Sequence, residues 1–329
     1  MERKLLNVSH FPHIRHQDTT RSIMGDVIIA LVPSLIWGAY IFGVRVLSVV
    51  AVSVLSCVIS EAVFCLVLRK NQTVGDLSAV VTGIILACTF PAAVPLWIPA
   101  VSGVFAIVFV KQLFGGIGKN ILNPAAAARV LACLFPQTER YSLPFEKLPV
   151  LAEVSPEGLV SEAIYDLKDG IIPPISLFDM FIGNSVGGIG TVSCLLLVAG
   201  GLYLVVRKII SVRIPLAFLL SAAAMFYLFP KNIMTEEYMI YHLLSGGLVF
   251  CSIFMATDFS TSPMTGTSRI IFGAGCGVIT VFLRYMGFEG VYTALIIMNL
   301  SAGLLDRITL PRPFGKVLSR NKKTKQPEE

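Results

Sequence analysis

The 329-residue chain is poor in charge. Only 14% of its residues are Asp, Glu, Lys or Arg, whereas 55% are hydrophobic, and its mean hydropathy is +0.79. A soluble domain cannot hide that much apolar surface. The sequence therefore predicts an integral membrane protein. It also predicts an all-α fold, because a backbone in lipid must satisfy its own hydrogen bonds.

Histidine is scarce, and cysteine is never paired along the chain. Three of the four histidines, His10, His13 and His16, recur at every third residue, but no other ligand stands near them. The cysteines stand singly in apolar segments without a Cys-x-x-Cys motif, so core packing is expected. They are Cys57, Cys65, Cys88, Cys133, Cys194, Cys251 and Cys276. No metal site and no catalytic residue are predicted.

The N-terminus lacks a secretory signal. Residues 1–22 are polar for too long, and no small-residue cleavage site follows the first apolar run, so the first helix is expected to stay. The net charge of +6 is concentrated in the C-terminal segment 306–329. Without basic and aromatic residues interleaved, nucleic-acid binding has little support. A basic cytoplasmic tail beside anionic membrane lipid is expected instead.

Apolar runs predict about ten transmembrane helices. They form a first five-helix half over 23–136, an extracytoplasmic loop over 137–188 and a second half over 189–305. The predicted spans are 23–42, 46–68, 77–90, 95–113, 121–136, 189–206, 212–229, 241–257, 269–286 and 289–305. Basic residues in the loops, Lys111 among them, place both termini in the cytoplasm.

The two halves resemble each other. The run "FGGIGKNILNPAAAARVL" of the fifth span resembles "FEGVYTALIIMNLSAGLLD" of the tenth, with Asn123 and Asn299 each followed by small residues. The run "ACTFPAAVP" after the third span likewise resembles "ATDFSTSPM" after the eighth. Because each half has an odd number of helices, the two copies are expected as inverted repeats, with sites at broken helices.

The fifth span contains an arginine in an apolar run. Asn123 and Pro124 suit an N-cap and a first helical turn. Arg129 then follows about 9 Å further along the helix, at a depth where a charge needs a partner. Two readings are open: Arg129 snorkels or pairs with Asp258 or Asp306, or it faces a ligand. The acids Glu61 and Asp306 are expected as boundary residues rather than a proton path.

Two further segments offer polar groups at helix ends. The eighth span ends in Asp258, Thr261 and further hydroxyl residues, which suit cofactor recognition or ion coordination but equally suit a loop capping the ninth helix. "FIGNSVGGIGTVSCLLL" places glycines, including Gly187 and Gly190, before Ser193 at the start of the sixth span. Such a turn favours phosphate, or is simply a flexible entrance to the membrane.

Taken together, these blocks resemble the family that contains RnfD, a membrane component of the Rnf complex, and NqrB, its counterpart in the sodium-translocating NADH:quinone reductase. The similar blocks include "PHIRHQDTTRSIMGD", "FGGIGKNILNPAAAARVLACLFP", "FIGNSVGGIG", "MATDFSTSPMT" and "MNLSAGLLDR", and the resemblance runs from about Pro12 to Arg307. It implies a protein of the bacterial cell membrane that works together with the other proteins of an Rnf-like complex. Flavin-mediated electron transfer between ferredoxin and NAD is then coupled to sodium or proton translocation.

The resemblance also implies FMN linked to a threonine of a Ser/Thr-Gly-Ala-Thr motif in the outer loop. Here Ile164 stands at that threonine, and Glu162 replaces the glycine. An isoleucine has no oxygen for a phosphoester, and a glutamate repels phosphate. The glycine turn departs as well, with Thr191 and Val192 where the family has glutamate and threonine. Covalent FMN is therefore not expected, although Ser161 and Thr191 could offer substitute hydroxyls.

A second flavin site is implied on the cytoplasmic side. The fifth-helix start and the end of the eighth span face that side, so Asn123, Arg129, Asp258 and Thr261 are expected to line a site for non-covalent FMN or riboflavin. Gly187, Gly190 and Ser193 are candidate residues on the outer side. The alternative is a divergent paralogue that acts as a non-redox channel or transporter, or as a structural membrane component.

Overall fold

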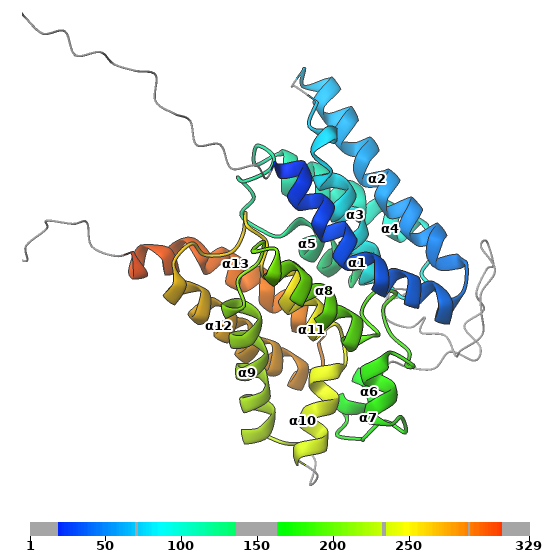
Figure 1. The fold of residues 1–329 in the computed structure, drawn as a ribbon, viewed down its shortest axis with the longest axis vertical. Coiled ribbons are helices and arrows are strands. Elements are labelled where there is room, and N and C mark those ends of the chain that lie inside the picture. The colour runs from blue at the N-terminus through cyan, green and yellow to red at the C-terminus, as the bar shows by residue number, and fades with distance from the viewer. Residues whose placement is uncertain (1–18, 70–71, 136–162, 232–234, 289, 311–329) are drawn as a thin grey trace, which may run out of the picture.

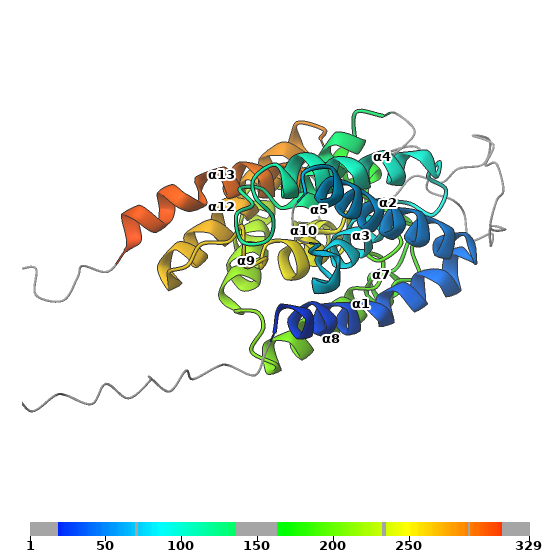
Figure 2. The ribbon, with the colours of Figure 1, turned by 90° about the horizontal axis from the view of Figure 1, so that it is seen from above.

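The computed structural model describes residues 19–69, 72–135, 163–231, 235–288 and 290–310, which form helices and connecting segments without a strand. His10, His13, His16, Ser161, Glu162 and most of the basic tail lie outside these ranges. Figures 1 and 2 show the blue-to-cyan helices of the first half beside the green-to-orange helices of the second. The domain boundaries drawn from the sequence remain predictions.

The helices follow the order of the ten predicted spans. The first half contains α1 (Thr20–Phe42), α2 (Arg45–Val67), the 3-10 turn η1 (Val74–Asp76), α3 (Ser78–Cys88), α4 (Trp97–Phe105) with the π-helix η2 (Ala106–Gln112), and α5 (Pro124–Ala132). The second contains α8 (Cys194–Val206), α9 (Arg213–Leu228), α10 (Thr235–Leu244), α11 (Leu248–Phe250) with the π-helix η4 (Cys251–Met255), α12 (Gly266–Tyr285) and α13 (Gly290–Thr309). Between the halves lie α6 (Ala163–Lys168) and α7 (Leu177–Ile182).

Several helices can cross a bilayer. Within the described residues, α1, α2, α12 and α13 are long and apolar enough on their own, and α10 with α11 and η4 adds a fifth span bent by 61°. Shorter apolar helices are α3, α4 with η2, α8 and α9. The prediction of an all-α, multi-pass membrane protein is confirmed.

Corresponding helices of the two halves run in opposite directions. α1 packs against α8, and α5 packs against α13. One cavity is lined by residues near the starts of α1, α3 and α5 and by residues at or beyond the ends of α8, η4 and α13. We call this side of the bundle the inner end. The opposed directions are those that two inverted repeats require.

The eighth span is broken in its middle, whereas the sequence predicted one helix over 241–257. Its break falls at Gly246 and Gly247, whose φ angles are 62° and 66°, in the left-handed region that favours glycine. The buried Arg284 donates to the carbonyl oxygens of His242 (2.6 Å) and Ser245 (3.0 Å). The guanidinium therefore satisfies carbonyls that the break frees from helical bonding.

A second buried arginine donates hydrogen bonds to carbonyl groups beyond the end of α3. Arg45, at the start of α2, is buried and donates from Nε to the carbonyl of Ala92 (3.0 Å) and from Nη2 to that of Val94 (3.2 Å). Non-helical backbone at membrane depth is thus stabilised within the protein in both halves.

Glycine allows α1 and α8 to approach closely. A Cβ atom on Gly200 would lie 2.5 Å from the carbonyl oxygen of Ala30, which is too close for any real contact. We expect Gly200→Ala to lower the free energy of unfolding by about 1–3 kcal/mol because the two backbones must separate. Thermal unfolding in detergent would measure this. Gly25→Ala, on α1 where nothing lies within 4 Å, is the matched control. Equal stability of the two variants would contradict the close packing.

Candidate cofactor cavity

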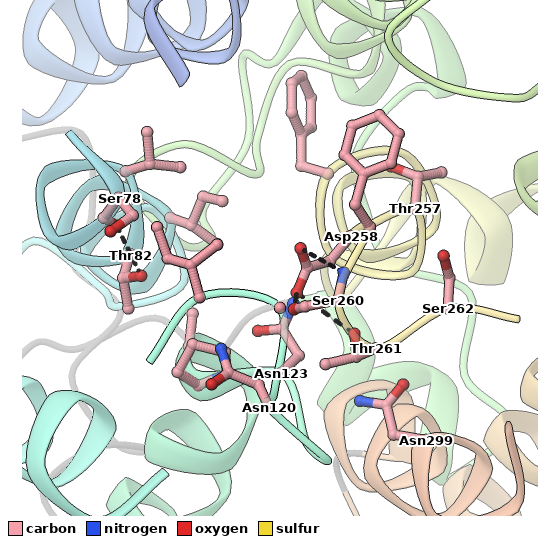
Figure 3. Close-up of a pocket in the computed structure, with 18 of the residues that line it drawn as sticks. Ser78, Thr82, Asn120, Asn123, Thr257, Asp258, Ser260, Thr261, Ser262 and Asn299 are labelled. Atoms are coloured by element: carbon pink, nitrogen blue, oxygen red, sulfur yellow. Dashed lines mark hydrogen bonds between the residues drawn. The ribbon is translucent and has the colours of Figure 1, made fainter. Parts of the chain in front are cut away.

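A cavity of about 530 Å³ opens between the two halves at the inner end. Its walls come from α1, α3, η2, the segment before α5, the segment after α8, the loop after η4, and α13. Figure 3 shows the polar side chains gathered around it: Ser78, Thr82, Asn120, Asn123, Thr257, Asp258, Ser260, Thr261, Ser262 and Asn299. The volume falls in the range of small-molecule and cofactor sites, and so does the mixture of apolar walls with a few polar groups.

Asn123 joins the two halves at the cavity wall. Its Oδ1 accepts from the backbone N–H of Ala126 at 3.1 Å and so caps α5, with Pro124 in the first turn. Its Nδ2 donates to the carbonyl of Met255 at 3.1 Å, at the end of η4. The predicted N-cap is therefore correct. The same side chain fixes the loop that carries the other polar wall.

The loop after η4 forms the other polar wall of the cavity. The carboxylate of Asp258 accepts from the hydroxyls of Ser260 (2.9 Å) and Thr261 (3.3 Å), which fold the loop around it. Desolvation raises the pKa of Asp258 above its ordinary value, and the hydrogen bonds from Ser260 and Thr261 oppose that rise. The structure thus brings Asn123, Asp258 and Thr261 together in the lining of one cavity, and their contact with a cofactor stays a prediction.

Two asparagines in the lining have hydrogen-bonding atoms without a protein partner. Asn299, on α13, is 3% exposed, and neither its Oδ1 nor its Nδ2 has a partner in the described part of the chain. The Oδ1 of Asn120 is in the same situation. Leaving a buried amide unpaired costs about 1–3 kcal/mol, so such groups require explanation. Both residues line the cavity, but these unpaired atoms are themselves buried, so a ligand would pair with them after the side chain rotates toward the cavity.

A buried ion pair also reaches the cavity. Lys111 in η2 lines the wall at 2% exposure and donates to Glu61 Oε1 at 2.7 Å and to Ser78 Oγ at 2.5 Å. Thr73 and Gln112 donate to the same carboxylate oxygen, each at 2.7 Å. Glu61 is fully buried rather than a boundary residue. Lys111, expected from the sequence to be a loop charge, belongs to the protein interior.

Arg129 does not line this cavity. It is 4% exposed, and its guanidinium carbon lies 5.6 Å from the ring centroids of both Phe90 and Tyr292. It does not pair with the two acids considered from the sequence. Asp258 is bonded as described above, and Asp306 accepts from the backbone N–H groups of Met264 and Thr265 and from the Ser268 hydroxyl. The reason is distance along α5: its first residue, Pro124, is at the cavity, and Arg129 is about one and a half turns beyond.

The glycine turn packs against the end of α3. The N–H of Gly190 donates to the carbonyl of Cys88 at 2.9 Å, and that of Ile189 to Phe90 at 2.8 Å. Gly187 is half-buried in the same turn, and Ser193 caps α8 through its hydroxyl. The turn therefore has a clear packing role. A phosphate contact there stays a prediction.

Ile164 is packed into the protein. It is 2% exposed, and a Cβ on Gly246 would lie 2.3 Å from its Cδ1 atom. Thr191 lies at the same break, because its Cγ2 would be 3.4 Å from a Cβ on Gly247. The Thr191 hydroxyl donates to the carbonyl of Gly188 at 3.2 Å. Ile164 and Thr191, two of the positions expected to depart from the family pattern, thus lie at the same helix break.

Sequence reasoning overlooked part of the lining. Asn120 stands three residues before Asn123 in "KNILNP", so two amides flank one helix start, a signal that could have been used. Asn299 was noted only as a repeat residue. Ser78, Thr82 and Lys111 gave no local signal, because only the packing of α3 and η2 brings them to the cavity.

The fold and this cavity define a multi-pass membrane protein with an open, cofactor-sized cavity between its two halves. The family described as NQR2, RnfD, RnfE matches residues 7–315, and the chain belongs to that family.

Named relatives are similar over nearly their whole length. The chain is 42% identical to the D component of the Na(+)-translocating ferredoxin:NAD(+) oxidoreductase complex of Acetobacterium woodii, covering 94% of this chain and 95% of the relative. It is 32% identical to the D component of the proton-translocating complex of Clostridium ljungdahlii, covering 96% and 98%. It is 36% identical to the D component of the ion-translocating oxidoreductase complex of Stutzerimonas stutzeri, covering 89% and 92%.

Proposed function

We propose that this chain is the RnfD component of an Rnf-like membrane complex and holds a non-covalent flavin in the inner cavity. The complex would couple electron transfer between ferredoxin and NAD to sodium or proton translocation. The names of the full-length relatives support this assignment. They differ in the ion, so the ion translocated by this chain is a matter for experiment. The inner end would face the cytoplasm, with both termini on that side.

The unpartnered amides carry the cofactor proposal. The pyrimidine edge of a flavin ring presents carbonyl acceptors beside an N–H donor, and an asparagine amide offers the complementary donor and acceptor. Asn299 and Asn120 belong to the lining, and rotation of either side chain would bring such a group to the cavity. Ala125 and Gly303 in the lining leave room for a flat ring close to the backbone. The residues present therefore fit a flavin.

The protein contributes position and environment to this chemistry. A bound flavin supplies electron transfer, whereas the chain decides where the ring lies and how dry its surroundings are. Asn123 and the Asp258 loop shape one wall, and apolar residues such as Val81 and Leu204 exclude water from others.

Burial of Ile164 supports non-covalent attachment. A buried hydrocarbon side chain, packed against Gly246, has no atom that can form a phosphoester. We expect the purified protein to show flavin absorbance and to release its flavin on denaturation. No fluorescent band should remain after SDS gel electrophoresis, with a family member that keeps the threonine as the positive control.

Two results would contradict the proposal in different ways. A fluorescent band that survives SDS, mapped by peptide mass to the segment around Ile164, would overturn non-covalent attachment. Purified protein without any flavin would overturn the cofactor assignment itself. That result would favour the alternative of a non-redox channel, transporter or structural membrane component.

A further inference from the structure

A smaller pocket of about 150 Å³ adjoins the cavity at the inner end. It lies between the segment that follows α8, the loop after η4, and the first turn of α12. Both spaces share wall residues, among them Ile209, Thr257 and Ser262. The full lining is Lys208, Ile209, Ile210, Ser211, Ile214, Thr257, Phe259, Ser262 and Arg269.

The lining of this side pocket is basic. Lys208 and Arg269 are its charged residues, and no carboxylate belongs to it. Arg269 donates from Nε to the carbonyl of Pro263 at 3.0 Å, which fixes the guanidinium beside the pocket. Lys208 is exposed and Arg269 is half-buried, and within the described residues the Lys208 ammonium and the Arg269 Nη groups have no hydrogen-bond or ion-pair partner, so both remain available to a ligand. The hydroxyls of Ser211 and Ser262 likewise have no hydrogen-bond partner within the described residues. Cationic donors and hydroxyls together are the usual ligands of a phosphate group.

Lys208 stands at the end of α8 in a left-handed backbone conformation. Lys208 has a φ of 59°, and the N–H of Ile209 bonds to the carbonyl of Leu204 at 2.9 Å, which closes the end of α8. Glycine is the usual residue in this conformation.

We propose that the side pocket binds a phosphate group through Lys208 and Arg269. Two sources share this chemistry. One is the terminal phosphate of a flavin mononucleotide whose ring occupies the adjoining cavity, and this source rests on the function proposed above. The other is the headgroup of an anionic phospholipid, because basic pockets at membrane-helix ends also bind such lipids. If the FMN phosphate is the ligand, the pocket selects FMN over riboflavin, which has no phosphate.

The experiment compares Lys208→Gly and Arg269→Gln with the unaltered full-length protein in detergent. Lys208→Gly removes the ammonium and relieves the backbone conformation, so loss of folding cannot explain its effect. Arg307→Gln, an exposed arginine on α13, is the matched control. Released flavin is separated into FMN and riboflavin by chromatography. Bound phosphatidylglycerol is measured by native mass spectrometry after its addition to delipidated protein.

The outcomes separate the two sources. If FMN in the unaltered protein falls about tenfold in both variants, or gives way to riboflavin, the flavin phosphate occupies the pocket. If the flavin is unchanged but phosphatidylglycerol binding falls by that factor, the lipid occupies it. If neither changes relative to Arg307→Gln, the phosphate site is overturned. If the unaltered protein carries no flavin, the proposed cofactor fails, and the lipid measurement still decides the pocket.

Discussion

Replacing Lys111 by methionine is expected to destabilise the protein more than any other single change considered for this chain. Glu61 is fully buried, and within the described residues its only cationic partner is Lys111, whose Nζ lies 2.7 Å from Oε1. Removing one member of a buried ion pair leaves the other charge uncompensated, which costs about 3–5 kcal/mol. Thermal unfolding and the yield of monodisperse protein in detergent would measure the loss.

A double variant tests the cause of that loss. Glu61→Leu combined with Lys111→Met removes both charges, so most of the stability should return, although Thr73 and Gln112 lose an acceptor. Lys119→Met, at an exposed lysine before Asn120, should leave stability unchanged. If the single Lys111 variant is as stable as the Lys119 variant, the buried pair does not have the role assigned to it.

Replacing Asn299 by leucine is expected to separate stability from cofactor binding. Its amide has no protein partner within the described residues, so an apolar side chain of similar size should leave the flavin-free protein equally or more stable. Flavin affinity should instead fall by about tenfold to a hundredfold, because a hydrogen bond to the ring is lost. Flavin retained after gel filtration and a thermal unfolding curve give the two readings.

The control for this variant is Asn184→Leu, an exposed asparagine at the outer end. It should change neither flavin content nor stability. Full flavin retention by Asn299→Leu would show that this amide does not face the cofactor. A loss of stability alone would mean that the amide supports the fold through contacts other than those with a flavin.

Both variants lie in walls that meet at the cavity, but they differ in what they report. Lys111 contacts Glu61 and Ser78 within the first half, so replacing it is expected to lower the free energy of unfolding. Asn299 belongs to the second half and lines the cavity, and its buried polar atoms have no partner within the described residues. The first result measures the scaffold of the site, and the second measures the site.

The sequence predicted the elements well, because lipid leaves the backbone few choices. Apolar length alone marked α1, α2, α12 and α13, and their observed ends lie within a few residues of the expected ones. The start of α5 followed from Asn123 and Pro124, whose capping roles are local. The break inside the eighth span was not predicted, because the carbonyls that it frees are satisfied by Arg284, which is distant in the sequence.

Composition and apolar runs were enough to establish from the sequence an all-α, multi-pass membrane protein. The opposed halves and an isoleucine at the flavin-anchor position are predictions from repeats and family motifs. The sequence also predicted that Asn123, Asp258 and Thr261 share a site, but tertiary structure decided the remaining polar lining of the cavity. It joined Asn120, Asn123, Asp258 and Asn299, and it placed Arg129 between two aromatic rings away from them. The physical reason is that helix formation depends on neighbours in the chain, whereas a cavity depends on how distant helices pack.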